Sequence, residues 1–136
     1  MDLEVGMGTA EVTINGICYG GSYAGFVNSD CDDHTRSVLT DKVTLDGDVY
    51  GGSYGNYVRG KIELNLLSPT ITGNIFGGGD AAPVTGNPTV VAIYGSTTNI
   101  YAGGKGSTAI VTGSPTATIN LTSGKTLSVA DVFGGG

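Results

Sequence analysis

The chain has 136 residues, of which 25 are glycine and only 13% are charged, and its formal net charge is −6. This length suits one domain, and the negative charge argues against nucleic acid or anionic membranes as partners, since phosphate contacts require a basic patch. Because no run of about 18 apolar residues occurs, no membrane insertion is expected. A chain this poor in charge and rich in β-branched residues is expected to fold by pairing strands.

Five short segments, each with an aromatic residue followed by glycines, recur along the chain and define an internal repeat. Their aromatic residues are 31, 26, 25 and 32 positions apart, and the second residue after each of them is always glycine. A valine, isoleucine or cysteine always precedes the aromatic residue. The aromatic residues are Tyr19, Tyr50, Phe76, Tyr101 and Phe133, and those before them are Cys18, Val49, Ile75, Ile100 and Val132.

Between these segments lie short stretches in which apolar and polar residues mostly alternate, as they do in half-buried strands. The alternating stretches are residues 10–16, 41–47, 60–66, 89–95 and 116–122. A shorter V-x-G segment precedes them in three repeats, at residues 57–60, 83–86 and 110–113. No window shows the three- and four-residue apolar spacing of a helix.

Each repeat thus has three short strands, which cannot bury an apolar face alone but can do so when similar units stack. We predict an all-β fold, a single β-solenoid domain over residues 1–136, built as a right-handed parallel β-helix of about five coils with glycine corners. The aliphatic residues should form an inward ladder and the aromatic residues an outward one. A phosphate-binding role for the glycines is disfavoured, because no helical pattern follows any of them.

Two longer matches carry a resemblance to a known group of repeats. The sequences PVTGNPTVVAI and IVTGSPTATIN, taken with NIFGGG and DVFGGG, resemble the glycine-rich β-helical repeats of large secreted surface proteins and adhesins of bacteria. The resemblance covers nearly the whole chain, apart from an excursion expected at about residues 22–38. It implies an extracellular or cell-surface location and a role in adhesion or scaffolding, and it implies no catalytic residues.

The excursion contains the acidic sequence NSDCDDHTR, which includes Asp30, Asp32, Asp33 and the single histidine of the chain, His34. Carboxylates suit calcium, and cysteine with histidine suits zinc, but adjacent residues rarely converge on one ion. A solvated acidic loop is therefore expected, with no metal and no cofactor. The match of residues 103–111 to a calcium-binding nonapeptide is incidental, because Thr108 replaces the ligand aspartate.

The lysines and arginines are scattered over different phases of the repeat, so they form no catalytic face and the chain is not expected to be an enzyme. The two cysteines lie in unlike places. Cys18 occupies the inward ladder, where a thiol acts as a small hydrophobe, whereas Cys31 lies in the polar excursion. A disulfide between them would tie the excursion to the first coil in an oxidising compartment, although the inward position of Cys18 argues against it. Both states remain open.

The two ends of the chain match in phase with the repeat. If the C-terminus is joined to the N-terminus, the eighth residue after Phe133 is Val5. Val58 likewise lies eight residues after Tyr50. The match fits a piece of a longer array, and it also fits protomers that stack head to tail into a filament, since neither end carries a polar cap.

Two classes of function remain. The leading one is a structural and adhesive repeat module of a bacterial extracellular or cell-surface protein. The alternative is a glycan-binding module or a phage-fibre-type adhesin, in which sugar rings stack on the aromatic ladder. Ice binding is a third class, but KIELNLL and TVVAIYG break any regular threonine ladder. The ligand-binding residues of the alternative would be Tyr19, Tyr50, Phe76, Tyr101 and Phe133.

Overall fold

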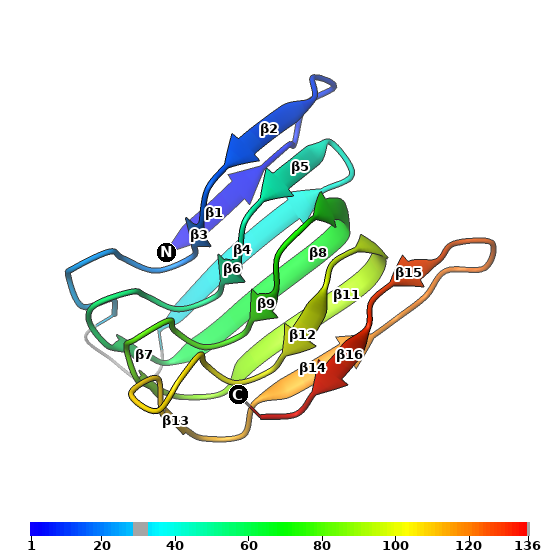
Figure 1. Ribbon diagram of the computed structural model, residues 1–136. Coiled ribbons are helices and arrows are strands. Elements are labelled where there is room, and N and C mark those ends of the chain that lie inside the picture. The colour runs from blue at the N-terminus through cyan, green and yellow to red at the C-terminus, as the bar shows by residue number, and fades with distance from the viewer. Residues whose placement is uncertain (29–32, 136) are drawn as a thin grey trace.

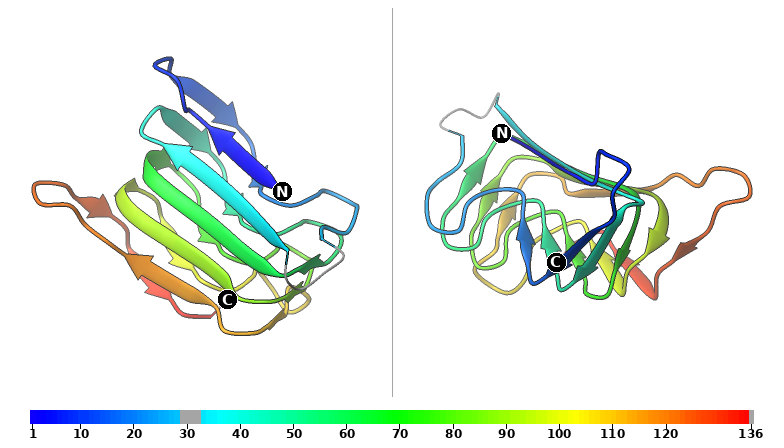
Figure 2. Two further views of the ribbon diagram at one scale, coloured as in Figure 1. Left: turned by 180° about the vertical axis from the view of Figure 1, so that it is seen from behind. Right: turned by 90° about the horizontal axis from the view of Figure 1, so that it is seen from above.

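The computed structural model describes residues 1–28 and 33–135, which form strands and no helix. In this part of the chain the paired strands run parallel, and three sheets stack as a β-solenoid of about four turns (Figure 1, Figure 2). The predicted all-β solenoid is therefore confirmed. The strands are β1 (Asp2–Val5), β2 (Val12–Asn15), β3 (Cys18–Tyr19), β4 (His34–Thr40), β5 (Val43–Asp46), β6 (Val49–Tyr50), β7 (Val58–Arg59), β8 (Lys61–Ile71), β9 (Ile75–Phe76), β10 (Val84–Thr85), β11 (Pro88–Ser96), β12 (Asn99–Tyr101), β13 (Val111–Thr112), β14 (Thr116–Ile119), β15 (Leu127–Ser128) and β16 (Asp131–Phe133).

From β6 onward, each coil passes once through all three sheets. From β9 the chain turns at a glycine corner, forms the short strand β10, continues through the long strand β11 and returns to β12 (Figure 1). There Ile100 pairs with Ile75, so β12 lies on β9 one coil later. The long strands β1, β4, β8, β11 and β14 lie side by side in one sheet (Figure 2). The V-x-G, alternating and aromatic segments of the sequence are therefore the three strands of one coil.

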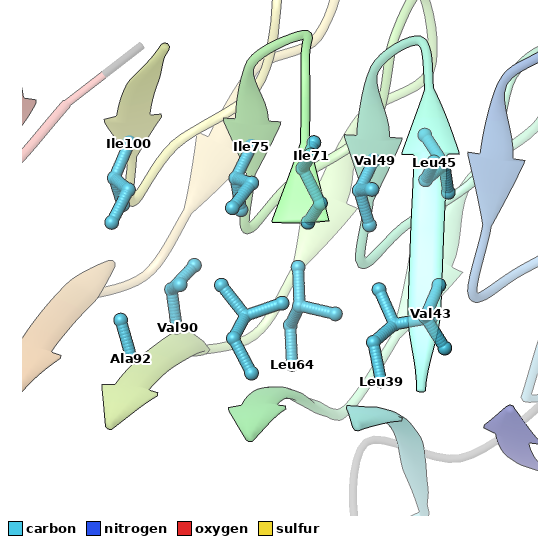
Figure 3. Close-up of a cluster of buried hydrophobic side chains, with 11 residues drawn as sticks. Leu39, Val43, Leu45, Val49, Leu64, Ile71, Ile75, Val90, Ala92 and Ile100 are labelled. Atoms are coloured by element: carbon cyan, nitrogen blue, oxygen red, sulfur yellow. The ribbon is translucent and has the colours of Figure 1, made fainter. Parts of the chain in front are cut away.

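The core lies between this long sheet and the five-stranded sheet of β3, β6, β9, β12 and β16. Val49, Ile75 and Ile100 point toward the apolar side chains of β4, β8 and β11, and at most 1% of each is exposed (Figure 3). The predicted inward ladder is confirmed at these rungs. Cys18 is half-buried and Val132 is 44% exposed. The two outer rungs are less buried because each has a neighbouring rung on one side only.

The glycines have two separate tasks. In the aromatic segments the need is close approach: a Cβ on Gly51 would lie 2.6 Å from the carbonyl oxygen of Gly77 in the next coil, and 2.7 Å from the Ile62 side chain. In the V-x-G segments the backbone conformation is a second cause, since Gly86 has a φ of +154°, which an L side chain rarely adopts, and a Cβ there would also collide with the carbonyl oxygen of Gly60. The predicted glycine corners therefore result from close approach in the aromatic segments and from both causes at Gly86.

The first coil follows the repeat further than the sequence suggested. Val27 forms a bridge with Val58, and His34–Thr40 form β4, which pairs in register with β8. The excursion expected at about residues 22–38 is therefore narrower than predicted. Seven positions separate Val27 from His34, but only three separate Val58 from Lys61.

The predicted equivalence of residues 10–16 and 41–47 with residues 60–66 is wrong. β2 pairs with β5, but β5 pairs with the end of β8, where Leu45 lies opposite Ile71. The beginning of β8 pairs with β4 instead. Each long side therefore consists of two segments joined at a bend, which lies at Ser68 in the second coil, with a φ of +70°.

The predicted phase match of the two chain ends is also wrong. Val5 lies in β1 opposite Leu39, and Leu39 lies opposite Leu66. Val5 therefore corresponds to a position eight residues after Val58, in a different sheet. The predicted number of coils needs a smaller correction, because the five aromatic rungs enclose about four turns.

Candidate functional site

The aromatic residues of the five rungs form one continuous stack. Neighbouring ring centroids lie 5.2, 4.9, 4.8 and 4.7 Å apart from Tyr19 to Phe133, and the interplanar angles are 17°, 7°, 7° and 6°. This spacing is that of parallel in-register strands, which places equivalent side chains directly above one another. The ring faces therefore contact each other inside the stack.

Two inner rings of this stack, Tyr50 and Phe76, are covered, contrary to the expectation of an exposed ladder, and the third, Tyr101, is half-buried. Tyr50 is 0% exposed and Phe76 is 6% exposed, whereas Phe133 in the last rung is 44% exposed. The rings lie on the far side of their strands from the core, as the alternation predicted, but side chains of the corner loops fold over them. Lys105 Nζ lies 5.8 Å from the centroid of the Tyr50 ring, and Tyr54 packs edge-on against Tyr19.

Polar groups along the edge of the stack tie distant coils together. The Tyr19 hydroxyl donates to Asp80 Oδ2 at 3.1 Å, and the Tyr50 hydroxyl donates to Asp48 Oδ2 at 3.2 Å. Lys105 Nζ donates to the same Asp48 oxygen at 3.3 Å. The Tyr19–Asp80 and Lys105–Asp48 contacts join coils that are not adjacent, because β6 lies between β3 and β9, and β9 between β6 and β12, whereas the Tyr50–Asp48 contact is local.

These contacts also shift the protonation equilibria of the groups involved. Burial and the nearby Asp80 carboxylate raise the pKa of Tyr19 above the ordinary value, and burial together with the Asp48 and Asp80 carboxylates raises the pKa of Tyr50. Burial acts to raise the pKa of Asp48, but the backbone N–H of Asn74 and the ammonium group of Lys105 outweigh it and hold that pKa low. The two phenols therefore stay protonated as hydrogen-bond donors, and Asp48 stays ionised as the acceptor of Tyr50.

A second set of stacked rings lies on the corner loops of the first two coils, and sequence reasoning missed it. Tyr23 stacks on Tyr54 with centroids 4.8 Å apart, and Phe26 stacks on Tyr57 at 5.7 Å. Tyr23 is 68% exposed and Phe26 is 58% exposed. The signal was present in the sequence, because these residues lie four and seven positions after Tyr19 and after Tyr50.

The acidic segment is described only in part. His34 begins β4 and is exposed, with its Nε2 atom 3.7 Å from Asp2 Oδ1. Asp30, Cys31 and Asp32 lie outside the described residues. Within residues 1–28 and 33–135 no group of three histidine, cysteine, aspartate or glutamate side chains is placed to hold a metal ion.

The predicted disulfide stays a prediction for the same reason, since Cys31 is one of the residues outside the described part. Its proposed partner, Cys18, lies in β3 at the edge of the core. Burial raises the pKa of the Cys18 thiol, so the thiol is held in its neutral form.

Nearly all exposed large hydrophobic residues of the described part lie in the first and last coils. We define the N-terminal end face by Met1, Met7, Ile17, Tyr23 and Phe26, and the C-terminal end face by Ile110, Ile119, Leu121, Val132 and Phe133. Each of these side chains is at least 40% exposed. Among the exposed large hydrophobic residues of the described part, Tyr54 alone belongs to neither face.

The core itself is open at both ends. Val5, Ile14 and Cys18 at one end, and Ala117, Leu127 and Val129 at the other, pack against the core yet remain only partly buried. A pocket of about 270 Å³ opens at the C-terminal end face, where Ile110, Val111 and Gly104 help to line it. Each end therefore presents unpaired strand edges together with uncovered apolar side chains.

The fold and these surfaces define the chain as a parallel β-solenoid with three sheets and two open ends. No protein-family model matches it, and neither a curated protein nor a solved structure shows significant similarity to it. Its described residues also include no helix long and apolar enough to cross a membrane.

Proposed function

We propose that this chain is a structural and adhesive repeat module of a bacterial extracellular or cell-surface protein, whose coils are continued by further coils at its ends. The observation that carries the proposal is the pair of end faces. Solenoids that act alone need polar caps, because an open edge pairs readily with other strands. Here both faces expose rungs of the same ladders that build the core, such as Val132 and Phe133.

The lateral surface also suits a scaffold. Two inner rings of the aromatic stack are covered, and buried tyrosines and carboxylates are engaged with one another. The coils are joined by hydrogen-bonded ladders and by contacts between coils that are not adjacent, such as Lys105 with Asp48. Such an arrangement favours a rod whose coils are linked to one another along its axis. Ligands, if any, would bind on its loops.

Sedimentation velocity of the full chain over a range of concentrations, together with electron microscopy, tests the proposal. We expect association that grows with concentration and produces fibres. The variant Val129→Pro/Val132→Lys should block growth, because proline removes a backbone donor and lysine charges an open edge. Thr85→Lys is the matched control, since it adds the same charge to an exposed position of the inner strand β10.

A monodisperse monomer at all concentrations would contradict the proposal. Equal association of Val129→Pro/Val132→Lys and Thr85→Lys would show that growth does not occur through the C-terminal end face. Circular dichroism of each variant separates a blocked edge from a failure to fold.

The second candidate function is glycan binding, and the exposure of Tyr23 and Phe26 favours a site on these two rings over one on the buried ladder. An exposed ring face can stack on a sugar ring, which Tyr50 and Phe76 cannot offer while they are covered. Glycan-array binding that is lost in Tyr23→Ala and kept in Tyr101→Ala would support this function. Loss in neither variant would exclude both aromatic sites.

A further inference from the structure

The two end faces are complementary to each other in one register. Resting on the proposed function, we propose that the occupant of the C-terminal end face is a second copy of this chain, whose first coil continues the ladders of the long sheet and of the five-stranded sheet. In this arrangement β16 pairs with β3 of the next copy, and β14 pairs with β1.

The five-stranded sheet sets the register of its own rung. Val132 pairs with Ile100, Ile100 with Ile75, Ile75 with Val49 and Val49 with Cys18, so position 18 is the first rung of the ladder that ends at position 132. Cys18 of the next copy would thus lie on Val132. Phe133, which is 44% exposed, would stack on Tyr19 of that copy and extend the ring stack without a break.

The long sheet gives the same alignment independently. Successive pairings relate Ile119 to Val5 and Ala117 to Leu3 through β11, β8 and β4. Apolar side chains therefore meet apolar side chains on the core side. On the solvent side the neutral Thr118 would meet Glu4, so no like charges are opposed along this strand pair.

The corner ladder is the part that this alignment does not continue. Val111 leads into β14, whereas Val27 leads into β4, which lies one coil after β1, so Val27 of the next copy would lie two rungs from Val111. Ile110 is 62% exposed and Phe26 is 58% exposed, and Ile110 lines the pocket at the C-terminal end face. In the stacked arrangement, Phe26 of the next copy therefore does not pack directly on Ile110, and the match rests on the two sheets.

This alignment is specific because a shift of one residue would turn every side chain to the opposite face. In the end rungs, aromatic residues would then lie opposite core residues, and carboxylates such as that of Asp131 would face the core. The stacking contact is heterologous, since two different faces meet, so it repeats along the axis and does not close at a dimer.

The native Cys18 allows a direct test of the register. In a Cys31→Ser background, Val132→Cys places a thiol at the rung next to Cys18 of the following copy, at the spacing of parallel strands, about 4.8 Å, which a disulfide can bridge. Under mild oxidation at concentrations where the chain associates, we expect a ladder of covalent oligomers on a non-reducing gel. Peptide mapping should show a link between positions 18 and 132, and a reductant should collapse the ladder.

The matched control is Asp131→Cys in the same background. Position 131 is also exposed and adjacent in sequence, but it is related to Ile17 rather than to Cys18. We expect it to cross-link no more than the Cys31→Ser parent. A second pair, Val5→Cys with Ile119→Cys in a Cys18→Ser/Cys31→Ser background, tests the long sheet and should give the same oligomer ladder.

Three results would overturn the inference. Dimers linked only between two copies of position 132 would show tail-to-tail contact, and cross-linking at position 131 that equals that at position 132 would show unspecific encounter. Association without any link at 18–132 or 5–119 would refute this register while leaving the proposed scaffold function intact. Absence of association altogether would refute both.

Discussion

Ser37 occupies a core position that every other coil fills with an apolar residue. In the long sheet it is aligned with Leu3, Leu64, Val90 and Ala117. It is 3% exposed, and its hydroxyl oxygen has no hydrogen-bond partner in the described part of the chain. A buried hydroxyl without a partner costs free energy, because it loses its contacts with water and gains none in return.

We therefore predict that Ser37→Ala leaves the free energy of unfolding unchanged or raises it by up to about 1 kcal/mol. Thr35→Ala is the comparison, since Thr35 is also buried but accepts a hydrogen bond from Asn28 Nδ2 at 3.2 Å. Its loss should lower the free energy of unfolding by about 1 kcal/mol. Urea unfolding measures both, and a clear loss of stability in Ser37→Ala would mean that its hydroxyl does have a partner.

The aromatic stack acts as an element of its own, with rungs that differ in burial although they are alike in sequence. Phe76 is covered on both faces by Tyr50 and Tyr101, whereas Phe133 has a ring on one face only. The contribution of each ring to stability should therefore depend on its rung.

Phe76→Ala is expected to lower the free energy of unfolding by about 3–5 kcal/mol, as truncation of a buried aromatic residue does. Phe133→Ala should cost much less, because its ring is 44% exposed already. Thermal or urea unfolding of the two variants below the concentration of association provides the comparison. Equal losses would show that burial within the stack does not decide the contribution of a ring.

At the scale of single elements, the sequence predicted the ladders well, but it predicted poorly which side chains cover them and which strands lie beside them. The aliphatic and aromatic rungs could be predicted because their residues recur at every repeat and lie in short strands of fixed pairing. The covering of Tyr50 could not, since it depends on how Lys105 reaches over the rings from a loop two coils away. β4 was missed because its sequence, HTRSVLT, follows an acidic segment and carries polar residues even at core positions.

Contacts between coils that are not adjacent bind the molecule together along its axis. Asp48, whose side chain is only 18% exposed, accepts from Lys105 across the intervening coil. Because its folded-state pKa lies below the ordinary value of 3.8, this carboxylate contributes stability above its unfolded pKa, and the contribution is lost as the pH falls through the folded pKa.

The stability of the protein should therefore fall on acidification below the ordinary pKa of an aspartate, about 3.9. The fall should be shallower in Asp48→Asn, which cannot titrate at this position, and in Lys105→Met, which removes the partner ammonium group. Unfolding by urea at a series of pH values gives the slopes. The same steepness in all three proteins would show that Asp48 does not contribute to the acid response.

The whole-molecule arrangement was predictable in class but not in register. The stacking of coils could be predicted because the sequence repeat is visible in any stretch of the chain. The alignment of the first coil depends on residues inserted between Val27 and His34, and a count along the chain cannot tell where an insertion falls. The count from Phe133 to Val5 likewise suggested a match that the strand pairing of β1 does not have. The complementarity of the end faces becomes visible only after strand pairing has assigned each residue to a rung of its ladder.

The stacking of one coil on the next also determines how the rod would respond to mechanical load. β1 and β16 belong to opposite ends of the solenoid, so a pull between them acts along the axis and along the hydrogen bonds (Figure 1). The terminal coils, bonded on one side only, should detach first and release the chain in steps. The 25 residues from Phe76 to Tyr101 would add about 80 Å of extended chain per coil. A further coil seated on each end would raise the force at which this peeling starts, so extension would begin at the last uncovered end of an assembly.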